Sequence, residues 1–136
     1  MIAYLDASVL LRVVLREPKP LASWRRIERA FTSELTRVEC FRTIDRLRLG
    51  GHLDDDEVAG RRELVERRLE AMSIVPVDRR VLRRAAEPLP TALRTLDAIH
   101  VTTALTLRAR EPKLGFATHD AELVTAARAL GLRVMS

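Results

Sequence analysis

The sequence predicts an α/β protein, with a three-layer α/β/α arrangement and a mainly parallel central sheet of four to five strands. Short apolar runs of strand length alternate along the chain with longer amphipathic stretches of helical period. Parallel strands need long crossover connections, usually helices, and the amphipathic stretches supply them. We therefore expect a sheet with helices on both faces.

Apolar runs bounded by turn residues or acids mark the strands. The first run, Ile2-Ala-Tyr-Leu, is short and apolar, as expected of a strand buried on both faces. The second run is the weakest, since only Phe31 is strongly apolar. The predicted strands are residues 2–5, 31–33, 73–77, 114–117 and 132–135.

Prolines, glycines and acids mark the helix ends. Pro18 and Pro20 break the chain after the first helix, and Gly51 and Gly131 end two others. Four acids at 54–57 open a helix whose dipole they complement. The predicted helices are residues 8–15, 21–29, 37–49, 54–72, a short one from 78 that ends before Pro88, 95–108 and 120–130.

Length and composition bound the class of protein. We expect the 136 residues to form a single domain, 1–136, and the apolar share of 47% excludes a disordered chain. No apolar stretch reaches the ~20 residues of a membrane span, and the N-terminus meets Asp6 without a basic region, unlike a signal peptide. A cytoplasmic location is expected, and the single Cys40 fits a reducing compartment.

The chain is basic, with a net charge of +5 and a pI near 10.5. Of its 24 basic residues only Lys19 and Lys113 are lysines. Arginine carries a fixed charge and a planar fork that suits phosphate, so the composition favours a polyanionic partner. The alternative is that this chain uses arginine wherever a basic surface residue is needed.

Four acids lie at predicted helix starts. Asp6 follows the first strand and Asp120 the fourth, while Glu39 and Asp97 each lie in the first turn of a helix. Each acid can also have a purely structural role. Asp6 and Asp120 can cap a helix, and Glu39 can complete a capping box with Thr36. Asp97 can interact favourably with the helix dipole.

Together the four acids indicate a metal site. Ligands in such folds bind beyond the carboxyl ends of the strands, where the acids would gather and repel one another. One or two Mg²⁺ or Mn²⁺ ions would remove that repulsion and activate a water molecule for attack on a phosphate. Ser8 and Thr118, each two residues from an aspartate, can donate hydrogen bonds to the carboxylates or simply cap a helix.

At these residues the sequence resembles the PIN-domain ribonucleases, and more closely the VapC toxins of type II toxin–antitoxin systems. Four segments in order carry the resemblance over nearly the whole chain. The most specific is the third, an acid-bearing helix. The segments are Leu5-Asp-Ala-Ser8, Glu34-Leu-Thr-Arg-Val-Glu39, Leu96-Asp-Ala-Ile-His-Val-Thr-Thr-Ala104 and Thr118-His-Asp120 with the turn at Gly131.

The resemblance implies a PIN-like fold and a metal-dependent RNA endonuclease whose partner is a VapB-type antitoxin. It carries the catalytic and metal-binding roles onto Asp6 and Asp97, and also onto Glu39 and Asp120. It also implies a homodimer or a toxin–antitoxin hetero-oligomer, with no membrane association. The RNA that is cut differs between members.

Other residues remain open at this stage. Arg94, three residues before Asp97, can bind substrate phosphate or orient an acid. His100 is expected to be packed and hydrogen-bonded, and Cys40 to pack in the core. Trp24 can anchor an antitoxin, although a half-buried aromatic is the favoured interpretation.

Three other function classes compete with the nuclease. A phosphatase of the haloacid-dehalogenase type also places an aspartate after its first strand, but it needs a second acid two residues later, where this chain has Ser8. A receiver domain needs a lysine after a late strand, and Lys113 precedes the fourth. A non-catalytic PIN-like binding module would keep the acids only as helix caps. Glycine-rich dinucleotide and phosphate-loop motifs are absent.

Overall fold

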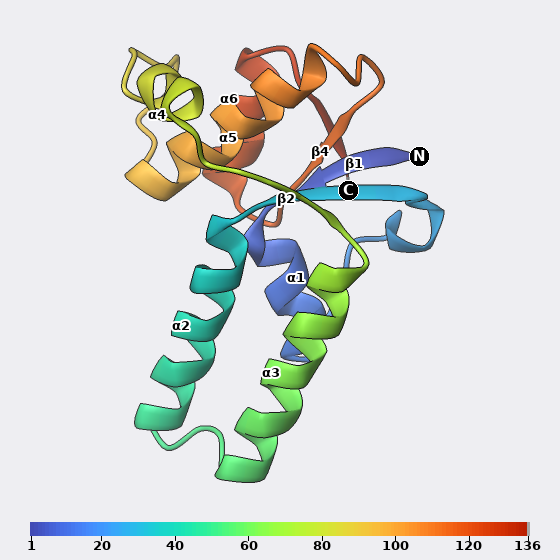
Figure 1. Cartoon of the computed structure of the whole chain (residues 1–136), viewed down its shortest axis with the longest axis vertical. Coiled ribbons are helices and arrows are strands. Elements are labelled where there is room, and N and C mark those ends of the chain that lie inside the picture. Colours follow the sequence, from blue (N-terminus) through green and yellow to red (C-terminus); the bar gives the residue numbers. More distant parts are fainter. Residues whose placement is uncertain (136) are drawn as a thin grey trace.

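The computed structural model describes residues 1–135, and in them a five-stranded sheet carries helices on both faces (Figure 1). The strand order is β3-β2-β1-β4-β5 and every neighbouring pair is parallel. The three-layer prediction is confirmed, with a fully parallel sheet. The strands are β1 Ile2–Leu5, β2 Arg29–Ser33, β3 Ser73–Val75, β4 Gly115–Ala117 and β5 Arg133–Met135.

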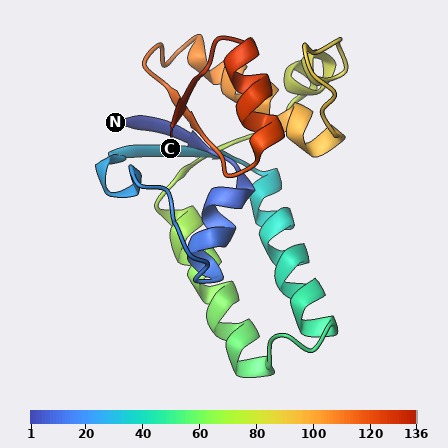
Figure 2. The same cartoon turned by 180° about the vertical axis from the view of Figure 1, so that it is seen from behind.

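Two groups of helices cover the sheet from opposite sides, as the two opposed views show (Figures 1 and 2). Helices α1, α2 and α3 lie on one side, and α4, α5 and α6 on the other. Strand β1 is followed by α1 on one face of the sheet, and the adjacent strand β4 is followed by α6 on the other face. The chain therefore turns to opposite faces after these two neighbouring strands. A crevice is expected at such a switch point. The helices are α1 Ala7–Val14, α2 Leu35–Leu49, α3 Asp55–Glu70, α4 Arg79–Ala85, α5 Thr95–Arg108 and α6 Ala121–Ala129.

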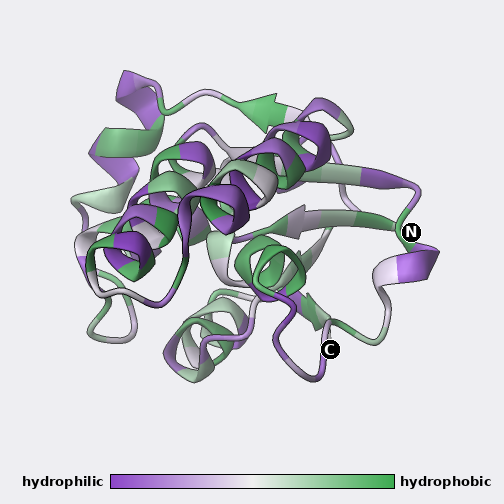
Figure 3. Ribbon diagram, turned by 90° about the horizontal axis from the view of Figure 1, so that it is seen from below, coloured by the Kyte–Doolittle hydropathy of each residue, from purple (hydrophilic) through white to green (hydrophobic). Residues whose placement is uncertain are grey.

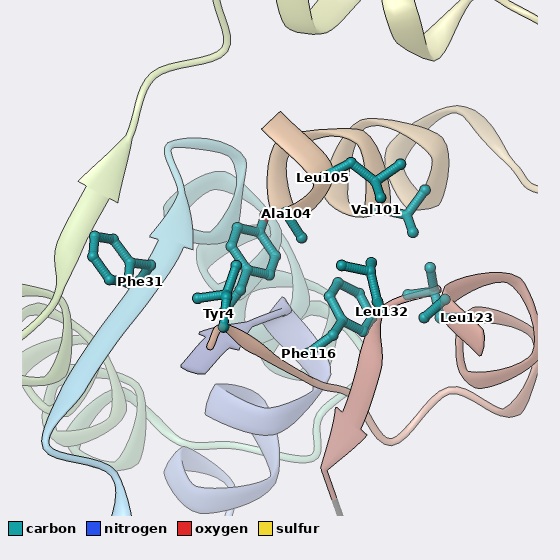
Figure 4. Packing of buried hydrophobic residues seen from close by; sticks show 10 residues of the cluster. Tyr4, Phe31, Val101, Ala104, Leu105, Phe116, Leu123 and Leu132 are labelled. Atoms are coloured by element: carbon teal, nitrogen blue, oxygen red, sulfur yellow. The ribbon is translucent and has the colours of Figure 1, made fainter. Parts of the chain in front are cut away.

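The main core lies between the sheet and α5 with α6 (Figure 4). The rings of Tyr4 and Phe116, on the adjacent strands β1 and β4, stack with centroids 5.6 Å apart and planes 6° apart. Val101 and Leu105 of α5 and Leu123 of α6 close over these rings. This packing fixes the two strands whose carboxyl ends form the crevice.

A second core joins α1, α2 and α3 below the sheet. Leu10 and Val14 of α1 pack with Ile44 of α2 and Val65 of α3. Figure 3 shows the strands mostly in hydrophobic colours, while hydrophilic residues concentrate on the helices and loops. Within residues 1–135, none of the helices has the length and apolar character to cross a bilayer.

The predicted helix over 21–29 is wrong. Only a three-residue 3-10 turn forms, η1 at Trp24–Arg26, and Arg29 begins β2. The backbone N–H groups of Glu28 and Arg29 both donate to the carbonyl of Met1, at 2.8 and 3.3 Å. Pairing with the first strand therefore takes the residues that would have continued the helix, and tertiary contacts override local propensity.

Candidate active site

The four predicted acids line a single pocket of about 420 Å³ at the switch point. Asp6 comes from the end of β1, Glu39 from α2, Asp97 from the first turn of α5, and Asp120 from the residue before α6. Three separate crossovers bring them together, since the first acid, Asp6, and the last, Asp120, are 114 positions apart in the sequence. The gathering expected from the sheet topology is therefore present.

Asp6 lies buried in this pocket at the junction of β1 and α1, with 4% of its surface exposed. Its Oδ1 accepts a hydrogen bond from Ser8 Oγ at 2.6 Å and caps α1 through the N–H of Val9 at 3.3 Å. Its Oδ2 accepts from Thr118 Oγ1 at 2.7 Å. Burial raises the pKa of Asp6, although the hydrogen bonds from Ser8 and Thr118 oppose that rise. Both expected hydroxyl donors thus act on one carboxylate.

Glu39 is held by a buried histidine. His100 Nε2 lies 2.6 Å from Glu39 Oε1, and His100 Nδ1 lies 2.8 Å from the hydroxyl of Tyr4. A carboxylate only accepts hydrogen bonds, so Nε2 donates to Glu39, and a neutral imidazole then accepts at Nδ1 from Tyr4. His100 is 1% exposed and cannot swing away. The expectation of a packed, hydrogen-bonded histidine is confirmed, and its partner is a site acid.

Asp97 and Asp120 complete the acidic wall. Burial raises the pKa of Asp97, and the negative charges of Asp120, Asp6 and Glu39 raise it further, while His100 lowers it. Asp120 caps α6, because its Oδ1 accepts from the N–H groups of Glu122 and Leu123 at 2.7 and 3.1 Å. The mutual repulsion expected for gathered carboxylates therefore acts most clearly on Asp97.

The capping box that Thr36 and Glu39 could form is absent from the structure. Helix α2 begins at Leu35, so Glu39 lies in its second turn, and Thr36 shares its hydroxyl with Thr32 at 2.6 Å instead of forming a capping box. Thr95 is already helical, and Arg94 takes the N-cap position of α5 without a side-chain cap bond. Because neither Glu39 nor Asp97 is used as a cap, both are available to a ligand.

The donor set suits a hard divalent cation. Four carboxylates in one pocket are the ligands that Mg²⁺ and Mn²⁺ prefer. Burial is the main cause of the raised pKa of Asp97, and the neighbouring carboxylates add a repulsion that a cation would relieve. Across residues 1–135, no three acidic, histidine or cysteine side chains stand close enough together to hold an ion in their present rotamers. Ion binding would therefore require these side chains to move closer together than they stand here.

Two arginines of this pocket were not predicted as site residues from the sequence. Arg42 and Arg46 of α2 line it beside Glu39. Their spacing of three and seven residues from Glu39 places all three on one face of a helix, and that periodicity was visible in the sequence. Arg94 is exposed and is not among the lining residues.

The remaining candidates lie outside the acidic pocket. Burial raises the pKa of the Cys40 thiol to about 12, as expected of a core cysteine. Trp24 is half-buried, as favoured, and lines a larger hollow of about 650 Å³ beside the end of α1. That hollow contains only one acid, Glu17, so the smaller pocket is the one with metal-binding chemistry.

Comparisons with known proteins agree with this geometry. The sequence model of the PIN domain matches residues 3–129. Ribonuclease VapC46 of Mycobacterium tuberculosis is 35% identical over 136 residues, covering 98% of this chain and 95% of the relative. Ribonuclease VapC35 of the same organism is 36% identical over 139 residues, covering 98% and 95%.

A solved structure shares the fold. VapBC2 from Rickettsia felis, bound to a DNA fragment from their promoter, superposes with a TM-score of 0.69 at 11% identity, covering 98% of this chain and 97% of that one. At this identity the likeness concerns the fold alone, whereas the matches at 35% and 36% identity extend over nearly the full sequence.

Proposed function

This chain belongs to the PIN domain family, with VapC proteins as relatives, and we propose that it is a Mg²⁺- or Mn²⁺-dependent RNA endonuclease. One observation carries the proposal: carboxylates from four separate elements line a single pocket at the switch point of the sheet. Two relatives that match almost the whole chain are named ribonucleases, which supports RNA as the substrate.

In the proposed site Asp6, Glu39, Asp97 and Asp120 are the metal ligands. A divalent ion bound there would activate water and neutralise charge on the phosphate. Ser8 and Thr118 hold Asp6 from both oxygens, so that this carboxylate keeps one orientation while the others adjust. The reaction is hydrolysis of an RNA phosphodiester, without a covalent enzyme intermediate.

The biological role that we propose is the toxin of a toxin–antitoxin pair, with a VapB-type antitoxin as partner. Its support is the relationship to VapC proteins and the fold shared with VapBC2. A basic chain with a pI near 10.5 also suits an acidic or nucleic-acid partner. The whole chain would act as one nuclease domain, as a homodimer or bound to its antitoxin.

A non-catalytic binding module is the second candidate, because Asp6 and Asp120 do serve as helix caps. A phosphatase of the haloacid-dehalogenase type has less support: the family match is to PIN, and Ser8, at the position of the second acid, is a donor to Asp6.

RNA cleavage tests the proposal. The purified chain, freed of any antitoxin, is incubated with total bacterial RNA and Mg²⁺ or Mn²⁺, beside Asp97→Asn and the control Asp55→Asn, an exposed acid at the start of α3. We expect discrete fragments from the wild type and from Asp55→Asn, and none from Asp97→Asn or with EDTA. Cleavage that survives Asp97→Asn or EDTA would contradict the proposal, and absence of both cleavage and Mn²⁺ binding would favour the binding module.

A further inference from the structure

One face of α2 carries both acidic and basic groups into the pocket. Glu39, Arg42, Thr43 and Arg46 all line it, at helical positions i, i+3, i+4 and i+7. Residues at these spacings share one face, so they form a row along the helix axis. At 1.5 Å per residue, Arg46 lies about 10 Å along the axis from Glu39. The acids thus occupy one end of the row and two guanidinium groups the other.

The positive charges of this row are only partly neutralised by ion pairs within the protein. Arg46 donates to the hydroxyl of Thr43 at 3.0 Å and has no ion pair within residues 1–135. Arg42 pairs with Asp45 at 2.9 Å, but Asp45 is shared with Arg48, which binds its other oxygen at 2.8 Å. Two arginines against one half-buried carboxylate leave positive charge beside the pocket.

This arrangement matches the charge pattern of a bound RNA strand. The carboxylates alone would repel phosphates, and any ion they hold acts only at the bond being cut. Phosphates on either side of that bond need other cations, and the arginine fork is suited to them. A distance of about 10 Å is on the order of two to three nucleotides along a nucleic-acid strand.

We propose that Arg42 and Arg46 bind backbone phosphates of the RNA next to the scissile bond, so that the strand leaves the carboxylates along α2. The inference rests on the proposed nuclease function and adds a substrate path to it. Contacts of this kind position the strand without reading its sequence, so recognition of a particular RNA must come from elsewhere on the surface.

Arg48 provides a matched control. It is an exposed arginine on the same helix and pairs with the same Asp45, but it is not among the pocket residues. Replacing Arg46 or Arg48 by glutamine therefore removes the same charge from the same helix. Arg42, Arg46 and Arg48 are all exposed, so the fold should tolerate each change.

The experiment measures binding of a labelled single-stranded RNA of mixed sequence, by fluorescence anisotropy over a range of salt concentrations, in the Asp97→Asn background to prevent cleavage. We expect Arg46→Gln to weaken binding about tenfold. The slope of log K against log salt should become shallower by about 0.7, the value for one phosphate contact on a single strand. Arg48→Gln removes a charge outside the pocket and acts on Arg42 only through Asp45, so it should change the affinity and the slope much less than Arg46→Gln does. Arg46→Glu should weaken binding more than Arg46→Gln.

The outcomes distinguish a failure of the proposed RNA path along α2 from a failure of the proposed nuclease function. If wild-type protein cleaves RNA with Mg²⁺ while Arg46→Gln and Arg48→Gln bind alike, the path along α2 is wrong and the nuclease assignment stands. If the background protein binds no RNA and the wild type cleaves none, both are overturned.

Discussion

His100 should be required for the metal affinity of the site through Glu39, although it need not touch the metal itself. The change His100→Leu removes the donor to Glu39 Oε1 and the partner of the Tyr4 hydroxyl, which lie 2.6 and 2.8 Å from the ring nitrogens. A buried hydroxyl left unpaired costs about 1–3 kcal/mol. Glu39 is 22% exposed and can turn to water, so we expect little further loss of stability from it.

The effect on the site should be separable from the effect on stability. Loss of a group that orients a metal ligand typically reduces metal affinity or activity about 10–100-fold. In His100→Gln the side-chain nitrogen can take the place of Nε2 and keep the bond to Glu39. In His100→Asn the side-chain oxygen can take the place of Nδ1 and accept from the Tyr4 hydroxyl, while Glu39 loses its donor.

Calorimetric Mn²⁺ titration measures the effect on metal affinity, and thermal unfolding measures the effect on stability, for the three His100 variants and for Tyr4→Phe. We expect His100→Gln to retain most of the Mn²⁺ affinity, and His100→Asn to lose it despite equal or better stability. The variant Tyr4→Phe should lower stability with a smaller change in Mn²⁺ affinity. Equal Mn²⁺ affinity in His100→Asn, His100→Gln and the wild type would refute the positioning role.

Three further predictions follow from single features. Because the pKa of Cys40 is raised from 9.0 to about 12, its thiolate fraction at pH 8 should be about 1000-fold below that of a free thiol, and iodoacetamide should label it only after unfolding. Burial raises the pKa values of Asp6 and Asp97, so the folded protein binds protons at these two carboxylates more tightly than the unfolded chain does. The unfolding free energy of the metal-free protein should therefore contain a component that falls as the pH rises from about 4. Denaturant titrations at several pH values should show a smaller fall for Asp97→Asn than for the wild type. Gly131 has φ +73°, so Gly131→Ala should destabilise the protein by about 1–2 kcal/mol. Gly60 lies within α3 and faces open space, so Gly60→Ala should stabilise the protein by about 0.5–1 kcal/mol. Urea unfolding that ranks the two variants in the opposite order would contradict this backbone argument.

Local pattern was sufficient for the features that depend on neighbouring residues. The strand at Ile2–Leu5, the helix at Thr95–Arg108 and the caps by Asp6 and Asp120 all follow from apolar runs and cap preferences. The sequence also predicted that carboxylates would meet, because parallel strands place their carboxyl ends at one edge. The meeting of the carboxylates could therefore be predicted from the order and direction of the strands, without knowledge of side-chain contacts.

Contacts between distant residues could not be predicted in this way. The helix expected at 21–29 was lost to pairing of Arg29 beside β1, which no local window reveals. The bond between His100 and Glu39 joins residues 61 positions apart, and the one between Thr118 and Asp6 spans 112. Both depend on how α2, α5 and the loop after β4 pack against the ends of the sheet.

Direct measurement of metal binding is the sharpest test of the central claim, that these four carboxylates form a divalent-metal site. Mn²⁺ is titrated into metal-free protein by isothermal calorimetry, comparing the wild type with Asp97→Asn and Asp55→Asn. The account predicts saturable binding of one or two ions by the wild type and by Asp55→Asn, and at least tenfold weaker binding by Asp97→Asn. Equal binding by all three proteins, or none by the wild type, would contradict it.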